Sequence, residues 1–71
     1  IDVGAKSEIY RLMDELCRSN HSIIMISSDL PELLTMSDRV LVFRDGEIVK
    51  EFSNIKGISE EDVLKYAIRT Q

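Results

Sequence analysis

The sequence predicts an α/β fold whose elements follow the order helix, strand, short helix, β-hairpin, helix. Three observations predict it. Apolar residues recur at helical spacing early in the chain, and two short apolar runs, at 23–26 and 40–43, have the length and branching of buried strands. Asp45-Gly46 is a strong signal for a two-residue hairpin turn. The 71 residues contain no repeat and no internal domain boundary, so they are expected to form one small layered unit.

The first element is an amphipathic helix that starts within 2–5 and ends near Ser19-Asn20. Its opposite, charged face includes two pairs at helical spacing, Glu8–Arg11 and Asp14–Arg18, which indicate a solvated surface. The apolar residues form one stripe that we expect to be buried, with the cysteine as a small core side chain. They are Ile9, Leu12, Met13, Leu16 and Cys17.

The run 23–26 predicts a strand buried on both faces, and polar residues follow it at once. Asp29 is expected to cap a helix over 30–36, with Pro31 in its first turn and Glu32 reaching back to the cap. In parallel α/β sheets the carboxyl end of a strand is where ligands bind. Ser27, Ser28 and Asp29 therefore form either a polar site or a simple helix cap, and the residues alone leave both interpretations open.

The second half begins with a strand over 40–43 that is apolar on both faces. The Asp-Gly turn leads into a half-exposed edge strand over 47–52, and after a polar connector Ser59 is expected to cap the last helix. That helix is predicted to bury Val63, Leu64, Ala67 and Ile68. Two strands that need cover on both faces exceed what three helices of this size supply, so one sheet face is expected to be thinly covered.

Composition and residue inventory exclude several functions. The net charge is −4 and no basic stripe is present, which argues against nucleic-acid binding. No apolar run approaches the roughly 20 residues that a spanning helix needs. His21 is expected in a surface turn, and one cysteine with one distant histidine gives no metal-ligand spacing. The sequence contains neither GxGxxG nor GxxxxGK[ST], so we predict no catalytic residue and no metal site in this chain.

Four segments in order nevertheless resemble the end of an ABC transporter ATPase domain. They are Ile1-Asp2-Val3-Gly4-Ala5-Lys6, Ile23-Ile24-Met25-Ile26-Ser27-Ser28-Asp29-Leu30-Pro31-Glu32, Met36-Ser37-Asp38-Arg39-Val40 and Phe43-Arg44-Asp45-Gly46-Glu47. The particular resemblance is to the second nucleotide-binding domain of bacterial sugar-import ATPases of the ribose, galactose and xylose type. It covers 1–52, while 53–71 resembles the variable C-terminal helix. The resemblance implies a partial P-loop NTPase fold across 1–71.

The resemblance assigns roles to two residues. Asp2 would be the aspartate of the D-loop, which crosses the interface between the two ATPase domains. Ser28 would occupy the switch-loop position, where the family usually has a histidine that contacts the γ-phosphate. A serine is shorter than histidine and carries no positive charge, so it organises developing phosphoryl charge poorly. We therefore expect this ATP site to be weakened or non-hydrolytic, with turnover falling mainly to its partner site.

The resemblance also implies a setting for the chain. The intact protein would couple ATP binding and hydrolysis to sugar transport, with ATP and Mg²⁺ as cofactors that this segment does not hold alone. Its partners would be the rest of the ATPase chain, membrane permease subunits and a sugar-binding protein, at the cytoplasmic face of the bacterial inner membrane. The phosphate loop would lie upstream, so the start at Ile1 is expected to be a cut. A separated segment of this kind is expected to expose apolar surface and to self-associate.

Two other readings of the sequence remain. One is a freestanding interaction or dimerisation module of α/β type without nucleotide chemistry. The other is a small enzyme with a site at Ser28 and Asp29, which is the weaker reading because no general base accompanies the serine.

Overall fold

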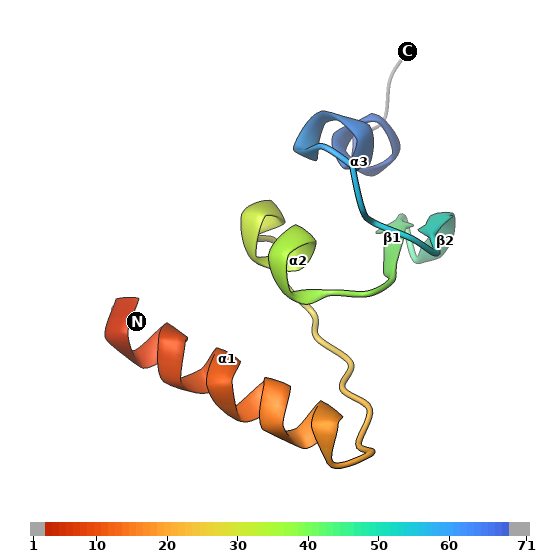
Figure 1. The fold of residues 1–71 in the computed structure, drawn as a ribbon. Coiled ribbons are helices and arrows are strands. Elements are labelled where there is room, and N and C mark those ends of the chain that lie inside the picture. The colour runs from red at the N-terminus through yellow and green to blue at the C-terminus, as the bar shows by residue number, and fades with distance from the viewer. Residues whose placement is uncertain (1–2, 69–71) are drawn as a thin grey trace.

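The computed structural model of the chain describes residues 3–68. This range contains three helices and one β-hairpin, arranged as Figure 1 shows. The predicted short helix, hairpin and last helix are confirmed, whereas the run 23–26 is not assigned as a strand. The elements are α1 (Val3–Arg18), α2 (Leu30–Met36), β1 (Val40–Arg44), β2 (Glu47–Phe52) and α3 (Glu60–Ala67).

The strands β1 and β2 form an antiparallel hairpin around the predicted turn. Asp45 and Gly46 have φ angles of 52° and 79°, the left-handed conformations that a tight hairpin turn of this kind requires. Val40 lies opposite Phe52, and the register shifts by one residue after Val42. Such a bulge increases the local twist of the strand pair.

The core lies on one face of the hairpin, against α3. Val40, Val42 and Val63 are each at most 5% exposed, and the first two project from the same side of β1. Neighbouring apolar side chains surround them, from α2, β2, the connector 53–59 and α3. They are Leu30, Leu34, Val49, Phe52, Ile55, Ile58 and Tyr66.

Two further features hold α3 over this core. Ser59 caps the helix as predicted and forms a reciprocal capping box with Asp62. The rings of Phe52 and Tyr66 meet edge to face at 5.9 Å, and the Arg44 guanidinium donates to the Tyr66 carbonyl at 3.1 Å. The helix is thereby fixed to both ends of the hairpin.

The other face of the hairpin is open, so the prediction that β1 is buried on both faces is wrong for this chain. Leu41 is 40% exposed and Phe43 is 62% exposed, because no described element covers their side of the sheet. The same correction applies to α3. Of the four residues predicted to be buried there only Val63 is, since Leu64, Ala67 and Ile68 are exposed.

The predicted central strand is an extended linker, not a buried strand. In Figure 1 this segment runs alone from the end of α1 to the start of α2. Ile24 is 91% exposed and Ile26 is 95% exposed, and the sheet described for residues 3–68 contains only β1 and β2. A strand needs the backbone groups of a neighbouring strand, and neither β1 nor β2 pairs with this segment. The extended conformation is retained, but its burial is not.

The apolar stripe of α1 is likewise only half covered. Ile9, Leu12 and Leu16 are each 45–46% exposed, and Cys17 is exposed, so the prediction of a buried stripe with a core cysteine is wrong. Figure 1 shows the reason, since α1 lies apart from the hairpin and α3. The charged face is confirmed, with ion pairs from Arg11 to Glu8 and from Arg18 to Asp14.

The one-sided core generates a prediction about stability. Val63→Ala removes two buried methyl groups and should lower the free energy of unfolding of the 71-residue chain by about 2 kcal/mol. Ile24→Ala, a change at a 91% exposed position, should alter it by less than about 0.5 kcal/mol. Urea unfolding followed by circular dichroism measures both. Equal losses for the two variants would show that the linker is buried in solution.

Candidate functional site

The polar residues after the linker form a capped turn at the start of α2. The Asp29 carboxylate accepts a hydrogen bond from the Glu32 amide at 3.1 Å, as a helix cap should. The Asp29 amide donates to the Ser27 hydroxyl at 3.0 Å. The capping interpretation is therefore confirmed, but the Glu32 side chain does not reach back to the cap as predicted. Ser28 lies between these residues and is exposed.

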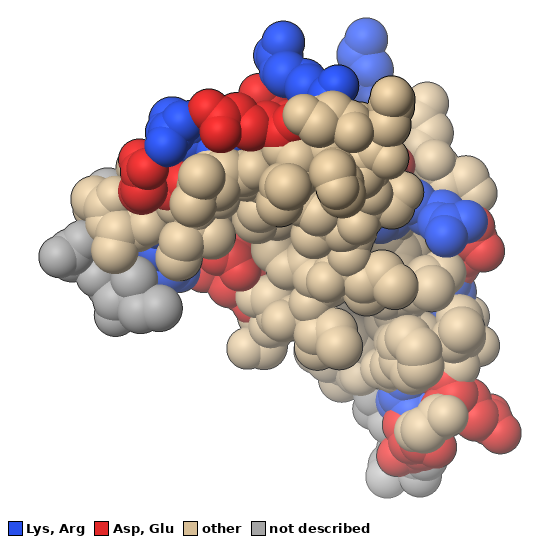
Figure 2. Space-filling model, turned by 90° about the horizontal axis from the view of Figure 1, so that it is seen from below, with Lys and Arg blue, Asp and Glu red and all other residues tan. Residues whose placement is uncertain are grey.

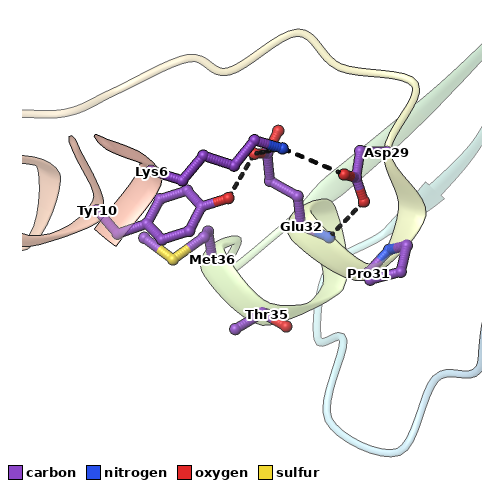
Figure 3. Close-up of a pocket in the computed structure, with 7 residues that line it drawn as sticks. All are labelled: Lys6, Tyr10, Asp29, Pro31, Glu32, Thr35 and Met36. Atoms are coloured by element: carbon purple, nitrogen blue, oxygen red, sulfur yellow. Dashed lines mark hydrogen bonds and ion pairs between the residues drawn. The ribbon is translucent and has the colours of Figure 1, made fainter. Parts of the chain in front are cut away.

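The Glu32 side chain points instead toward α1. Its Oε2 atom accepts a hydrogen bond from the Tyr10 hydroxyl at 2.6 Å and lies 3.7 Å from Lys6 Nζ. The same ammonium lies 3.5 Å from Asp29 Oδ2. Figure 3 shows Tyr10 and Lys6 reaching from α1 to these two carboxylates at the start of α2. The Glu32 side chain is only 16% exposed, so these contacts are partly shielded from water.

These contacts shift two pKa values in opposite directions. The hydrogen bond to Glu32 raises the pKa of Tyr10 from 10.0 to about 12, and desolvation and the charges of Glu32 and Asp29 act in the same direction. Hydrogen bonds from Tyr10 and then Ser27 lower the pKa of Glu32, and the Lys6 charge adds to the effect. At neutral pH the phenol is therefore a donor and the carboxylate is an ionised acceptor.

The cavity beside these residues has a volume of about 320 Å³. Its two carboxylates face one ammonium, and the lining contains no nucleophile paired with a general base. Within residues 3–68 no group of three or more His, Cys, Asp or Glu side chains could hold a metal ion. The arrangement joins two helices, and we assign it no catalytic chemistry of its own. The lining residues are Lys6, Tyr10, Asp29, Pro31, Glu32, Thr35 and Met36.

A larger open groove, of about 1230 Å³, runs between the linker and the uncovered side of β1 and α3. Apolar side chains from all three elements line it, among them Ile24, Ile26, Phe43 and Leu64. Figure 2 views the molecule from the side of α1 and shows a broad uncharged surface with charged side chains toward its margins. An exposed apolar surface of this extent is typical of an interface.

None of the helices in the described part of the chain is long and apolar enough to cross a membrane.

The residues singled out from the sequence have different outcomes. Asp2 lies outside the described residues, and Ser28 is exposed at the end of the linker, so their predicted roles stay predictions. His21 is exposed in a turn, as predicted, and its amide donates to the Leu16 carbonyl at 3.0 Å.

Sequence reasoning missed the tie between Tyr10 and Glu32 and the contacts of Lys6 with Asp29 and Glu32. The two tied residues are 22 positions apart, and a single polar contact at that separation leaves no periodic pattern in the sequence.

The raised pKa of Tyr10 generates a second prediction. In a Tyr66→Phe background, tyrosinate absorbance of the chain should report Tyr10 ionising near 12, and Glu32→Gln should bring that pKa back toward 10.0. Because the folded-state pKa is raised, the tie contributes its stability below pH 10 and loses it as pH rises toward 12. Glu61→Gln is the matched control on α3. An unchanged titration in the Glu32→Gln variant would show that the hydrogen bond does not form in solution.

Comparison with curated proteins finds sugar-import ATP-binding proteins among the relatives of this chain. The chain is 54% identical over 67 residues to a ribose import ATP-binding protein of Escherichia coli, which is 94% of this chain and 13% of that protein. It is 52% identical over 69 residues to a xylose import ATP-binding protein of Paraburkholderia xenovorans, which is 97% of this chain and 13% of that protein. A D-allose import ATP-binding protein of Escherichia coli K12 is 43% identical over 68 residues, 96% of this chain and 13% of that protein.

No protein-family model matches the chain, and no solved structure matches it either. The chain spans about 13% of the length of the curated relatives named above. Identity near one half over almost every residue of the chain is nevertheless well beyond chance resemblance. This chain is a homologue of one segment of the ATP-binding proteins of sugar-import ABC transporters.

Proposed function

We propose that this chain forms part of the ATP-binding subunit of a monosaccharide ABC importer, in which ATP binding and hydrolysis drive transport. The observation that carries the proposal is the 52–54% identity to ribose and xylose import ATP-binding proteins over 94–97% of the chain. The permease subunits and a sugar-binding protein are the proposed partners, and the cytoplasmic face of the bacterial membrane is the proposed location.

In this proposal the 71 residues do not hydrolyse ATP by themselves. A P-loop ATPase holds the phosphates of its nucleotide with a GxxxxGK[ST] loop, and the sequence contains none. The remainder of the ATPase chain is proposed to supply that loop and to hold ATP and Mg²⁺. This segment contributes residues at the edge of the site and at the interface between domains.

The same remainder is the proposed cover for the open apolar groove. The linker is extended and exposed, and it is rich in the β-branched residues that buried strands favour. A neighbouring strand from elsewhere in the ATPase chain would satisfy its backbone and bury Ile24 and Ile26. The open side of β1 would be covered by the same remainder of the ATPase chain.

Two residues are proposed to act at the nucleotide site. Asp2 is assigned to the D-loop, immediately before α1, and Ser28 to the switch-loop position at the start of α2. The exposure of Ser28 beside the helix cap supports this assignment, because its hydroxyl is accessible to a phosphate group. The absence of an imidazole there is the basis for proposing a weakened site.

The open groove favours a second candidate function, a dimerisation or interaction module that works without nucleotide. Its apolar lining would then bind a second copy of the chain or another protein. The two candidates differ in what covers Ile24 and Ile26.

The role of Ser28 generates a third prediction, for the full-length ATPase that contains this segment. Ser28→His should raise the ATPase kcat about tenfold, the effect expected from one well-placed hydrogen bond to developing phosphoryl charge. Ser28→Ala should leave kcat within about twofold of the starting protein. Steady-state ATPase assays of the purified transporter measure both. An unchanged kcat in Ser28→His would contradict the proposed role of this position.

The groove generates a fourth prediction, in which one double substitution has different consequences in two settings. Replacing Ile24 and Ile26 by Lys should abolish self-association of the 71-residue chain, because the exposed apolar linker drives it. In the full-length ATPase the same pair should destabilise the protein strongly, since two lysines would be buried without partners. Replacing Ser53 and Asn54 by Lys is the matched control on an exposed connector.

Sedimentation velocity and thermal unfolding measure these effects. A chain that is monomeric at every concentration would contradict the expected self-association. A full-length protein that tolerates the two lysines would favour the interaction-module candidate, because the linker would then remain uncovered in the intact protein.

A further inference from the structure

We propose that Glu32 is a positioning residue that fixes the segment carrying Ser28 relative to helix α1. The inference rests on the proposed function, in which Asp2, the residue before α1, and Ser28, the residue before the Asp29 cap of α2, both belong to the nucleotide site. It goes beyond that function because it names Glu32 as the side chain that links the helix after Asp2 to the segment that carries Ser28.

The first step is geometric. Glu32 accepts a hydrogen bond from the Tyr10 hydroxyl at 2.6 Å, and the Ser27 side chain is the second contributor to its lowered pKa. Ser27 directly precedes Ser28, and Tyr10 lies two turns into the helix that follows Asp2. One carboxylate therefore connects the helix after the first position to the residue beside the second, as Figure 3 shows for the Tyr10 side.

The second step concerns charge. Lys6 lies 3.5 Å from Asp29 and 3.7 Å from Glu32, so one ammonium serves as the counter-charge of both carboxylates. An ionised carboxylate accepts several hydrogen bonds at once, whereas a protonated one would have to donate its proton to a neighbour. The lowered pKa of Glu32 agrees with this, because it keeps the group in the accepting form.

The third step is that the two exposed isoleucines do not position the linker within this chain. Ile24 and Ile26 are more than 90% exposed, so their side chains do not fix its path. At the start of the linker, the His21 backbone amide donates a hydrogen bond to the Leu16 carbonyl. At its end, the Asp29 backbone amide donates a hydrogen bond to the Ser27 hydroxyl. The Glu32 contacts add the connection that relates this end of the linker to α1.

The experiment uses the full-length ATPase in a Ser28→His background, where the site is expected to hydrolyse. Adding Tyr10→Phe removes one hydroxyl and should lower kcat roughly threefold to tenfold while KM for ATP stays within about twofold. Glu32→Gln should lower kcat at least as much, and the two substitutions together should cost no more than Glu32→Gln alone. Tyr66→Phe and Glu61→Gln, both on α3, are the matched controls and should leave kcat unchanged.

Hydrogen exchange of the same variants reads the positioning directly. Amides of 23–29 should exchange several-fold faster in Tyr10→Phe and Glu32→Gln than in the controls, while those of the hairpin stay unchanged. Unchanged exchange at 23–29 would overturn the inference, as would additive effects on kcat or a rise in KM that matches the fall in kcat. Faster exchange together with a Ser28→His protein that gains no activity would support the positioning by Glu32 and refute the proposed role of Ser28.

Discussion

The burial of one face of the hairpin against α3 is the interaction on which the described structure depends. Val40, Val42 and Val63 are the only residues of the described part that are almost fully buried. A core of this size stabilises α2, the hairpin and α3, but it does not extend to α1 or the linker. The consequence is a molecule with one consolidated unit and one helix attached to it through polar contacts. Its apolar surface is concentrated on the sides that this core does not reach.

The linker shows how backbone hydrogen bonding limits what an apolar run can become. Its β-branched side chains favour an extended backbone, and that local preference is realised. Strand formation requires a partner edge as well, and in the described part of the chain the linker pairs with neither strand of the hairpin. The outcome is an extended segment with isoleucines in water, a state that costs free energy and is relieved by any apolar cover. The curated relatives are several times longer than this chain and supply an obvious source of such cover under the proposed function.

Features that depend on a few neighbouring residues could be predicted from the sequence, whereas burial and long-range contacts could not. The cap at Asp29, the turn at Asp45-Gly46 and the cap at Ser59 were predictable, because each depends on chemistry within a few neighbouring residues. The burial of Cys17 and Ile24 was predicted wrongly, because burial depends on which surface lies opposite and an apolar pattern does not identify that surface. The tie from Tyr10 to Glu32 could not be predicted, since two residues 22 positions apart met through a single hydrogen bond.

The polar nature of that tie has a consequence for how α1 is held. Polar contacts that water can reach contribute little net stability, so they orient a helix without anchoring it strongly. The half-exposed stripe of α1, with Leu12 46% exposed, would contribute more if an apolar surface covered it. In an intact ATPase domain we therefore expect packing of the stripe to supply the stability of α1. The contacts of Glu32 would then set its register against α2, because they are directional where apolar packing is not. A division of this kind would let Asp2, before α1, and Ser28, before the cap of α2, move as one unit when the domain changes conformation.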